Sequence, residues 1–176
     1  KIIDYDDKAY PKRLKEIINP PAVLYVDGEL PDIDNLVCIG MVGTRKASEY
    51  AIKAAHIMAK GITEAGALVV SGGALGIDTY SHLGALACGG KTVAVLGNGL
   101  GNNYLKANEG LRNMIKQSGA LVTEYQPNVP ANRTSFPMRN RIISGLSLGI
   151  LVVEAGVKSG SLITANLAME QNRDVY

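Results

Sequence analysis

The sequence predicts an α/β fold in which a mostly parallel β-sheet is covered by helices on both faces. Short apolar runs alternate with helical segments along most of the chain. Runs such as Gly149-Ile150-Leu151-Val152-Val153 are apolar at every position, and a strand of this kind needs cover on both faces. A length of 176 residues fits one domain that can bury a substantial core. We therefore expect residues 1–176 to form a single domain.

Residues 1–35 are expected to form an N-terminal addition that packs on the main sheet. A short helical segment around 12–18 ends at Asn19-Pro20-Pro21, and a strand over 22–26 closes at Asp27-Gly28. This addition carries five basic and eight acidic side chains, whereas the rest of the chain carries thirteen and eight, a net charge of +5. The later part of the chain therefore permits a nucleic-acid partner without establishing one.

After residue 35 the chain alternates between strands and helices. Strands are expected over 36–42, 69–71, 91–96, 120–124, 148–153 and 173–176. Helices are expected over 48–65, from the turn after Ser71 to about Cys88, and over 104–117, 138–145 and 161–172. The helix over 48–65 is amphipathic, with His56 on its polar face. We therefore expect His56 to be solvated rather than catalytic.

The stretch 69–78 reads Val-Val-Ser-Gly-Gly-Ala-Leu-Gly-Ile-Asp, which predicts a buried strand, a glycine turn and a helix start. Glycines let a ligand approach the backbone, and free amides at a helix start attract phosphate. We interpret Ser71, Gly72 and Gly73 as a cradle for a phosphate-like anion; a tight turn that binds nothing is the alternative. The dinucleotide fingerprint fails, because Ser71 stands where Gly is needed and no carboxylate ends the next strand. NAD is therefore not expected, and no cofactor is predicted.

Loops that follow parallel strands open at one edge of the sheet, so the special residues of this chain should gather there. The loops concerned are Gly43-Thr44-Arg45, Ser71-Gly72-Gly73, Gly97-Asn98-Gly99 and 155–160, with Arg45, Lys106, Arg139, Arg141 and Lys158 nearby. Such an edge suits an extended polyanion better than a single phosphate. We expect Arg45, Lys106 and Arg139 to be exposed there. Aromatic side chains near the loops could stack on bases or pack against the sheet: Tyr50, Tyr104 and Phe136.

Several motifs that would indicate catalysis are incomplete. Residues 84–92 miss the nucleotide-binding P-loop by one glycine and lie at the end of a helix instead of its start. Asp78 and His82 are four residues apart, which favours a hydrogen bond that ties down the helix start over an acid–base pair. Glu124 and Glu154 are single acids at strand ends, without an activated nucleophile. We therefore expect no catalytic residue and no metal site.

The cysteines and the hydropathy indicate a protein of a reducing compartment. Cys38 and Cys88 lie far apart in apolar surroundings and read as small buried side chains. No signal-like segment and no apolar run near 18 residues is present, so the expected location is the cytoplasm and no membrane partner is expected. The chain starts at Lys1 and stops within an expected strand, which predicts that it is a fragment.

Several motifs, in their order and spacing, resemble the DNA-processing protein A family, also called DprA or Smf. They cover nearly the whole chain: Val42-Gly43-Thr44-Arg45-Lys46-Ala47-Ser48, 71–78 with His82, 89–97, Phe136-Pro137-Met138-Arg139-Asn140-Arg141 continuing to Leu146, 153–155 and 159–165. The resemblance implies an extended Rossmann-like fold and a homodimer that binds and protects single-stranded DNA. It also implies a recombination mediator that helps load the recombinase RecA during natural transformation.

The same resemblance assigns the site. The family's basic residues map onto Arg45, Lys106, Arg139 and Arg141, although Leu105 stands where the family commonly has Pro. Together with the loops, the expected contacts to DNA are Gly43, Thr44, Arg45, Ser71, Gly72, Gly73, Lys106, Phe136, Arg139, Asn140, Arg141, Ser159, Gly160 and Ser161. Many family members add a small C-terminal winged-helix-like domain, which we do not find within this chain.

Two other functions share the glycine-rich layout. One is a nucleoside-monophosphate phosphoribohydrolase of the "lysine decarboxylase-like" kind, but Thr164 stands where the catalytic Glu of that signature is expected. The other is a small-nucleotide carrier, which has no need for Arg45, Lys106, Arg139 and Arg141 together. Both remain alternatives to DNA binding.

Overall fold

A computed structural model describes all 176 residues, and its centre is one eight-stranded sheet with the order β1-β2-β6-β5-β4-β3-β7-β8. The strands are β1 (Ile2–Asp4), β2 (Val23–Gly28), β3 (Cys38–Gly43), β4 (Leu68–Ser71), β5 (Thr92–Val95), β6 (Ala120–Thr123), β7 (Gly149–Glu154) and β8 (Asp174–Val175). The helices are α1 (Lys12–Lys15), α2 (Glu49–Glu64), α3 (Ile77–Ala87), the 3₁₀ turn η1 (Lys106–Asn108), α4 (Glu109–Ser118), α5 (Ser135–Leu146) and α6 (Gly160–Glu170).

The sheet is parallel from β6 to β8, and only β1 and β2 run antiparallel to their neighbours. The predicted α/β class with a mostly parallel sheet is therefore confirmed. From β3 the chain steps strand by strand to β6, and it then crosses back so that β7 lies on the other side of β3. The gap between β3 and β7 is the point where the strand order reverses, and ligands of open α/β sheets bind outside the strand ends at such a point.

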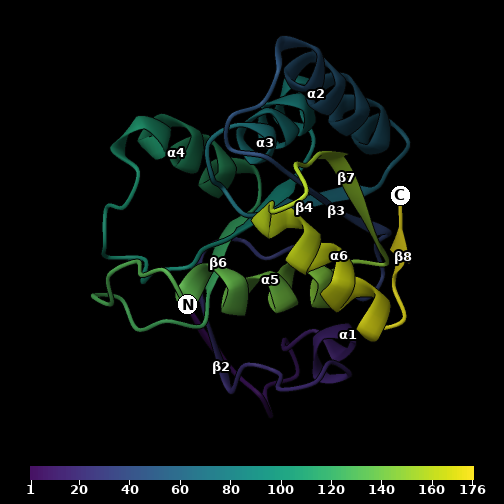
Figure 1. Cartoon of the computed structure of the whole chain (residues 1–176). Helices are drawn as coiled ribbons and strands as arrows, with labels where there is room; N and C mark the ends of the chain where they lie inside the picture. The colour runs from purple at the N-terminus through teal and green to yellow at the C-terminus, as the bar shows by residue number, and fades with distance from the viewer.

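Helices cover both faces of the sheet (Figure 1). The crossovers α2, α3 and α4 lie on one face, and α5 and α6 lie on the other together with α1. The largest core cluster is on the α5 side, where Leu14, Leu24 and Leu146 are fully buried. On the opposite face, small side chains such as Ala55 and Ala59 let α2 and α3 approach closely.

The first 35 residues extend the sheet and also fasten to α5. β2 pairs with β6 and β1 pairs with β2, which continues the sheet past its parallel part. Arg13 donates from Nη1 to the carbonyl of Leu146 at the end of α5, over 3.2 Å. Gly145 lies against Leu14 and Ile17, where an added side chain would collide. The addition therefore supports α5 as well as the sheet edge.

Several elements differ from the sequence expectation, and the short helix expected over 12–18 ends at Lys15. β1 was not predicted, because three residues give too short a pattern. The helix expected from residue 104 begins as the turn η1 and becomes α-helical only at Glu109. α5 begins at Ser135, three residues earlier than expected, and places Pro137 in its first turn, where the missing N–H has no helical partner to lose.

His56 is half-buried. None of the helices has the length and apolar character needed to cross a membrane.

Candidate functional site

Two adjoining cavities lie at the carboxyl ends of the parallel strands. The larger cavity, about 370 Å³, occupies the gap between the loops after β3 and β7. The smaller cavity, about 180 Å³, lies beyond the loops after β4 and β5. Both are lined by Arg45, Ala74, Phe136 and Arg139. The loops thus converge at one edge, as the parallel arrangement predicts.

Arg45, Phe136 and Tyr104 form the rim between the cavities. The guanidinium carbon of Arg45 lies 5.0 Å from the centre of the Phe136 ring, and Arg45 is exposed as predicted. The Phe136 ring lies 5.4 Å from that of Tyr104, at an angle of 43°. A cation over an aromatic face is attracted by the ring quadrupole. The rim therefore combines one exposed positive charge with two aromatic surfaces that a flat ligand can stack on.

Arg139, Asp78 and Gly72 form the floor beneath both cavities. Arg139 is only 4% exposed, so the expectation that it is an exposed contact is wrong. Its Nη1 donates to the carbonyls of Gly72, over 2.7 Å, and Val95. Gly72 separates Arg139 from Asp78, and any side chain there would collide with both.

The burial of Arg139 follows from its spacing within α5. Arg139 precedes Ile142, Ile143 and Leu146 by three, four and seven residues, so it lies on the same face of the helix as these residues, which is the face that packs on the sheet. The basic side chain type suggested exposure, but the position within the helix decided otherwise.

The floor keeps a positive charge that the protein only partly balances. Burial lowers the pKa of Arg139, but the group stays protonated because an arginine pKa begins so high. Burial also raises the pKa of Asp78, against the attraction of Arg139. The Asp78 carboxylate accepts a hydrogen bond from the amide of Ala74 over 3.3 Å, and the Nε of Arg139 has no partner. A buried cation with spare donor capacity favours an anion in the cavities above it.

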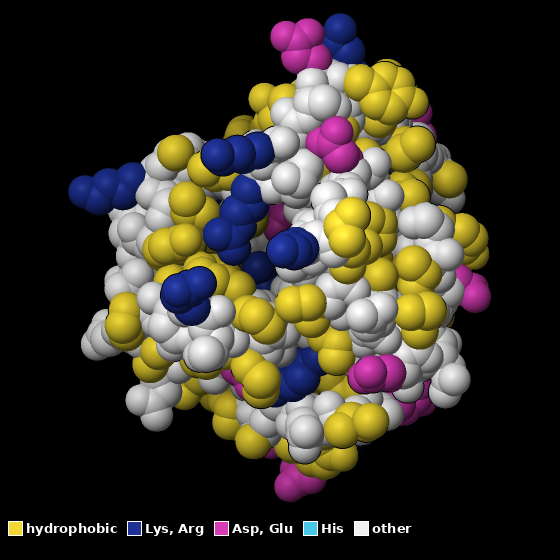
Figure 2. Space-filling view, in the orientation of Figure 1, with side chains coloured by type: hydrophobic (Ala, Val, Ile, Leu, Met, Phe, Trp, Pro, Cys, Tyr) yellow, Lys and Arg dark blue, Asp and Glu magenta, His cyan; other side chains and the backbone are white.

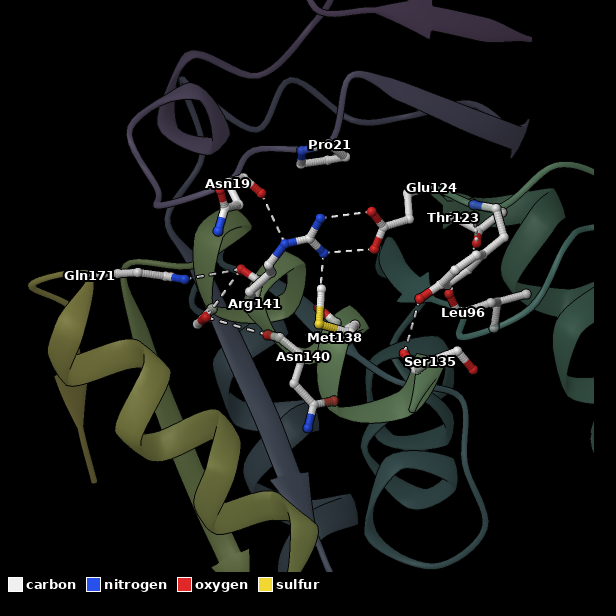
Figure 3. A network of polar contacts seen from close by, with 12 residues as sticks. Asn19, Pro21, Leu96, Thr123, Glu124, Ser135, Met138, Asn140, Arg141 and Gln171 are labelled. Atoms are coloured by element: carbon white, nitrogen blue, oxygen red, sulfur yellow. Dashed lines mark hydrogen bonds and ion pairs between the residues drawn. The ribbon is translucent and has the colours of Figure 1, made fainter. Parts of the chain in front are cut away.

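Arg141 does not reach the cavities. Two residues along a helix amount to a rotation of about 200°, so Arg141 points away from the side that carries Arg139. Its Nη1 and Nη2 donate to the two carboxylate oxygens of Glu124 over 2.6 and 2.7 Å (Figure 3). Its Nε donates to the carbonyl of Asn19 over 2.9 Å. Of the two predicted arginines on α5, only Arg139 lines the site.

Lys106 is exposed, as expected, but it lines neither cavity. Before it, Leu105 has φ +58°, which proline cannot adopt because its ring fixes φ near −65°. The backbone here is thus incompatible with the proline that the family resemblance leads one to expect at this position. Arg112 holds this loop by donating to the carbonyls of Tyr104 and Leu105 over 2.8 and 3.0 Å.

Arg112 also lines the smaller cavity and was missed by the sequence reasoning. Burial lowers its pKa without removing its charge. The available signal was its place on the first turn of the helix that follows the loop.

The larger cavity is lined mainly by polar groups of the loops after β3 and β7. Ser159 caps α6 by accepting from the amide of Ser161, and their hydroxyls lie 2.7 Å apart. Asn140 donates to the carbonyl of Gly160 over 3.3 Å. Further predicted residues lining this cavity are Gly43, Thr44, Gly160 and Ser161, and it also contains Lys46, Asp78 and Thr164, which were not predicted as contacts. Lys46 stands within the Val42–Ser48 motif, so the sequence did carry a signal for it.

One of the three residues of the predicted cradle, Ser71, lies outside the site. Ser71 is fully buried, lines neither cavity, and donates to the carbonyl of Met41 over 2.6 Å, so it joins β4 to β3. Gly72 and Gly73 do line the smaller cavity. Gly73 has φ +66°, a conformation that glycine adopts without steric cost.

Asp78 and His82 form neither an acid–base pair nor the predicted hydrogen bond. His82 Nδ1 lies 2.8 Å from the hydroxyl of Thr92, which itself donates to the carbonyl of Val69. His82 Nδ1 is therefore the donor, and Nε2 carries no proton. Burial, assisted by the charge of Arg139, lowers the pKa of His82 to about 3. His82 is thus a neutral core residue.

Positive charge gathers around this part of the surface. Figure 2 shows Lys and Arg side chains clustered about a hollow in the molecule. No group of three or more His, Cys, Asp or Glu side chains is arranged to hold a metal ion. The arrangement of exposed cations, aromatic rings and small polar groups suits a ligand that carries both phosphates and flat rings.

Comparison with known sequences gives a consistent result. The family described as DNA recombination-mediator protein A matches residues 1–176. The chain is 40% identical over 174 residues to DNA processing protein DprA of Bacillus subtilis and covers 59% of it. It is 40% identical over 176 residues to protein Smf of Escherichia coli and covers 47% of it. Each match covers 99% of this chain. The chain therefore spans about half to three-fifths of the length of these relatives.

Two solved structures of DprA proteins have the same fold as this chain. The X-ray structure of DprA from Streptococcus pneumoniae superposes with a TM-score of 0.93 at 40% identity, over 99% of this chain and 61% of that one. DprA from Helicobacter pylori, whose structure is described as giving insight into a single-stranded DNA binding mode, superposes with 0.89 at 28% identity, over 99% and 79%. A molybdenum cofactor binding protein from Rippkaea orientalis reaches 0.57 at 20% identity over 80% and 75%, which shows a shared Rossmann-like fold alone.

Proposed function

This chain belongs to the DNA recombination-mediator protein A family, and we propose that it binds single-stranded DNA across the rim between its two cavities. The observation that carries the proposal is the placement of Arg45 over Phe136, with Tyr104 alongside. Proteins that bind single strands without sequence preference combine cations that follow the backbone with aromatic rings on which bases stack. The rim supplies both within a few ångströms. The reported binding of single-stranded DNA by the H. pylori relative supports the same ligand class.

The residues of the site take different parts in this binding. Arg45 and Lys46 neutralise phosphates from the surface, and Arg139 adds a fixed positive charge from below. The amides and hydroxyls of Ser159 and Ser161 lie at the start of α6, where the helix dipole favours negative charge. Gly72 and Gly73 line the smaller cavity, and the missing side chain of Gly72 lets Arg139 and Asp78 approach the floor from both sides. Lys106 contacts the single-stranded DNA outside the cavities.

No catalytic step is part of this proposal. Asp78 is the one carboxylate that lines the cavities, and it is buried with a raised pKa beside Arg139 and accepts from Ala74. Thr164 lines the larger cavity at the place where a phosphoribohydrolase would need Glu. The enzyme and the small-nucleotide carrier thus remain the outcomes that the experiment must separate from DNA binding.

Family membership also supports a proposal about the cellular role. We propose that the chain acts in the cytoplasm as part of a recombination mediator, that it forms a homodimer, and that it helps load RecA on incoming single strands during natural transformation. Light scattering at tens of micromolar tests the dimer. A monomer mass would contradict it.

Fluorescence anisotropy tests the DNA-binding proposal. A labelled oligothymidylate, the matching duplex and a mononucleotide are titrated at two salt concentrations. We expect the single strand to bind most tightly and its affinity to fall as salt rises, because bound phosphates release counterions. Equal affinity for the duplex, or a mononucleotide that binds as tightly as the oligomer, would contradict the proposal. Release of base from a nucleoside monophosphate would favour the enzyme.

A further inference from the structure

We propose that Arg141 is a positioning residue and makes no contact with DNA: its ion pair with Glu124 fixes α5 against the sheet, and this holds Phe136 and Arg139 at the site. The inference rests on the proposed binding of single-stranded DNA. It removes Arg141 from the set of direct contacts and adds Glu124, an acidic residue, to the residues on which DNA binding depends.

The ion pair has the geometry of a rigid clamp. Both terminal nitrogens of Arg141 donate, one to each carboxylate oxygen of Glu124, over 2.6 and 2.7 Å. The side chains are 11% and 19% exposed, so solvent screens the pair little. Two parallel charge-assisted hydrogen bonds fix orientation as well as distance. Lysine offers the same charge but cannot reproduce this fork.

Arg141 has little donor capacity left for a phosphate. Besides the two bonds to Glu124, Nε donates to the carbonyl of Asn19 and Nη1 donates to that of Met138, each over 2.9 Å. An arginine has five N–H groups, and these four bonds occupy all but one. Figure 3 shows the side chain enclosed by these partners.

The contacts of Arg141 join four parts of the molecule. Glu124 follows the end of β6, Asn19 belongs to the N-terminal addition, and Met138 lies one turn earlier on α5. The main-chain carbonyl of Arg141 accepts from Gln171, just past the end of α6, over 3.3 Å. Arg141 is therefore the residue at which α5 is fastened to the sheet, the N-terminal addition and α6 together.

The fastened segment carries the site. Phe136 and Arg139 lie within the same helix as Arg141, at most five residues away, and a helix transmits a displacement as a rigid body. Arg139 must also reach the carbonyls of Gly72 and Val95 at the ends of β4 and β5. The Arg141–Glu124 pair sets the height of α5 relative to the sheet edge, and hence the distance of the Phe136 ring from Arg45.

The direction in which Glu124→Gln changes DNA affinity distinguishes the two possible roles of Arg141. If Arg141 bound phosphate, Glu124 would compete with the DNA, and Glu124→Gln would tighten binding by freeing the arginine and removing a negative charge. If the pair positions α5, Glu124→Gln weakens binding although it makes the protein more positive. Ordinary electrostatics cannot produce that second result.

The experiment measures anisotropy with the labelled oligothymidylate for the wild-type chain, Glu124→Gln, Arg141→Gln and Arg141→Lys. We expect all three variants to weaken binding by a similar factor, between about 2-fold and about 30-fold, as for substitutions that act without touching the ligand. Asp27→Asn is the matched control, because it removes one acid from the exposed pair with Lys116, which is not attached to α5. We expect that control to leave the affinity unchanged or slightly tighter.

A second readout reports geometry independently of stability. A strand that contains 2-aminopurine loses fluorescence when this base stacks on an aromatic ring, and the quenching at saturation does not depend on affinity or on the fraction of folded protein. We expect weaker quenching at saturation in the three pair variants than in the wild type and Asp27→Asn. Should Arg141→Gln fail to fold, Glu124→Gln and Arg141→Lys decide the question.

Two results would overturn the inference while leaving the proposed function intact: wild-type affinity and quenching in Arg141→Lys, or tighter binding in Glu124→Gln. Failure of the wild-type chain to bind the strand at any salt concentration would instead refute the proposed function.

Discussion

The rim and the floor of the site each contribute an arginine, one exposed to solvent and the other buried. At the rim, the Arg45 side chain is exposed, lies over the face of Phe136 and makes no hydrogen bond. In the floor, Arg139 is buried and holds the ends of two strands together. The difference teaches that one site can contain a charge that is available to a ligand and a charge that the fold itself requires. We expect substitutions at the rim to alter binding alone and substitutions in the floor to alter binding and stability.

The largest effect is expected from Arg139→Ala. Removing the side chain leaves the carbonyls of Gly72 and Val95 without their donor and leaves Asp78 without its compensating charge. Breaking a buried charge arrangement on one side costs about 3–5 kcal/mol. We expect a loss of about 3 kcal/mol in the free energy of unfolding, measured by urea denaturation. A loss below about 0.5 kcal/mol, the usual limit for surface positions, would mean that Arg139 does not stabilise the fold and behaves like an exposed residue of the rim.

Gly72→Val should have the next largest effect. The new side chain would collide with Arg139 and Asp78, and overpacking of this kind costs about 1–3 kcal/mol. Gly110→Ala is the matched control, since open space surrounds Gly110 in α4 and alanine favours the helix. Urea denaturation should show the loss in the first variant alone. Equal stability of Gly72→Val and the wild type would mean that the floor is not packed as described.

His82 makes the stability of the fold depend on pH. Its pKa is lowered from 6.5 to about 3 in the folded state, so between these values only the unfolded chain takes up the proton. Its contribution is complete above pH 6.5 and is lost by about 1.4 kcal/mol per pH unit as the pH falls toward 3. Asp78 has a raised pKa and acts in the opposite direction, but it is common to the wild type and His82→Gln.

The comparison of these two proteins therefore isolates the histidine. From pH 7 to pH 5, the free energy of unfolding of the wild type should fall by about 2 kcal/mol more than that of His82→Gln. Parallel curves would show that the folded protein does not hold His82 neutral.

The smallest effect on stability is expected from Arg45→Ala. The side chain is exposed and has no hydrogen-bond partner, so the free energy of unfolding should change by no more than about 0.5 kcal/mol. Binding of the single strand should nevertheless weaken for every sequence, and the slope of log affinity against log salt should decrease by about 0.7. Unfolding of this variant, or an unchanged affinity and slope, would contradict the assignment of Arg45 as an exposed contact to DNA.

Sequence patterns predicted most of the fold because apolar strands such as 149–153 dictate burial on both faces. They predicted the edge of the site because parallel strands bring their following loops together. They did not separate Arg139 from Arg141, because both side chains are basic and basic side chains are mostly exposed. The spacing of Arg139 with Ile142, Ile143 and Leu146 places it on the buried face of α5, whereas Arg141 lies off that face.

Long-range partners were equally beyond the sequence. The pairing of Arg141 with Glu124, and of His82 with Thr92, joins residues of different elements. Spacing along one helix had suggested that His82 would meet Asp78. The tertiary environment supplied a nearer hydroxyl instead, and burial then kept the imidazole neutral.

Hydrogen–deuterium exchange with and without oligothymidylate tests the location of the DNA most directly. We expect protection of the loops after β3, β4 and β5 and of the start of α6, and no change in β1, β2 or the outer face of α2. Protection confined to the N-terminal addition or to the α2 face, with the two cavities unaffected, would contradict the proposal that DNA lies across the rim.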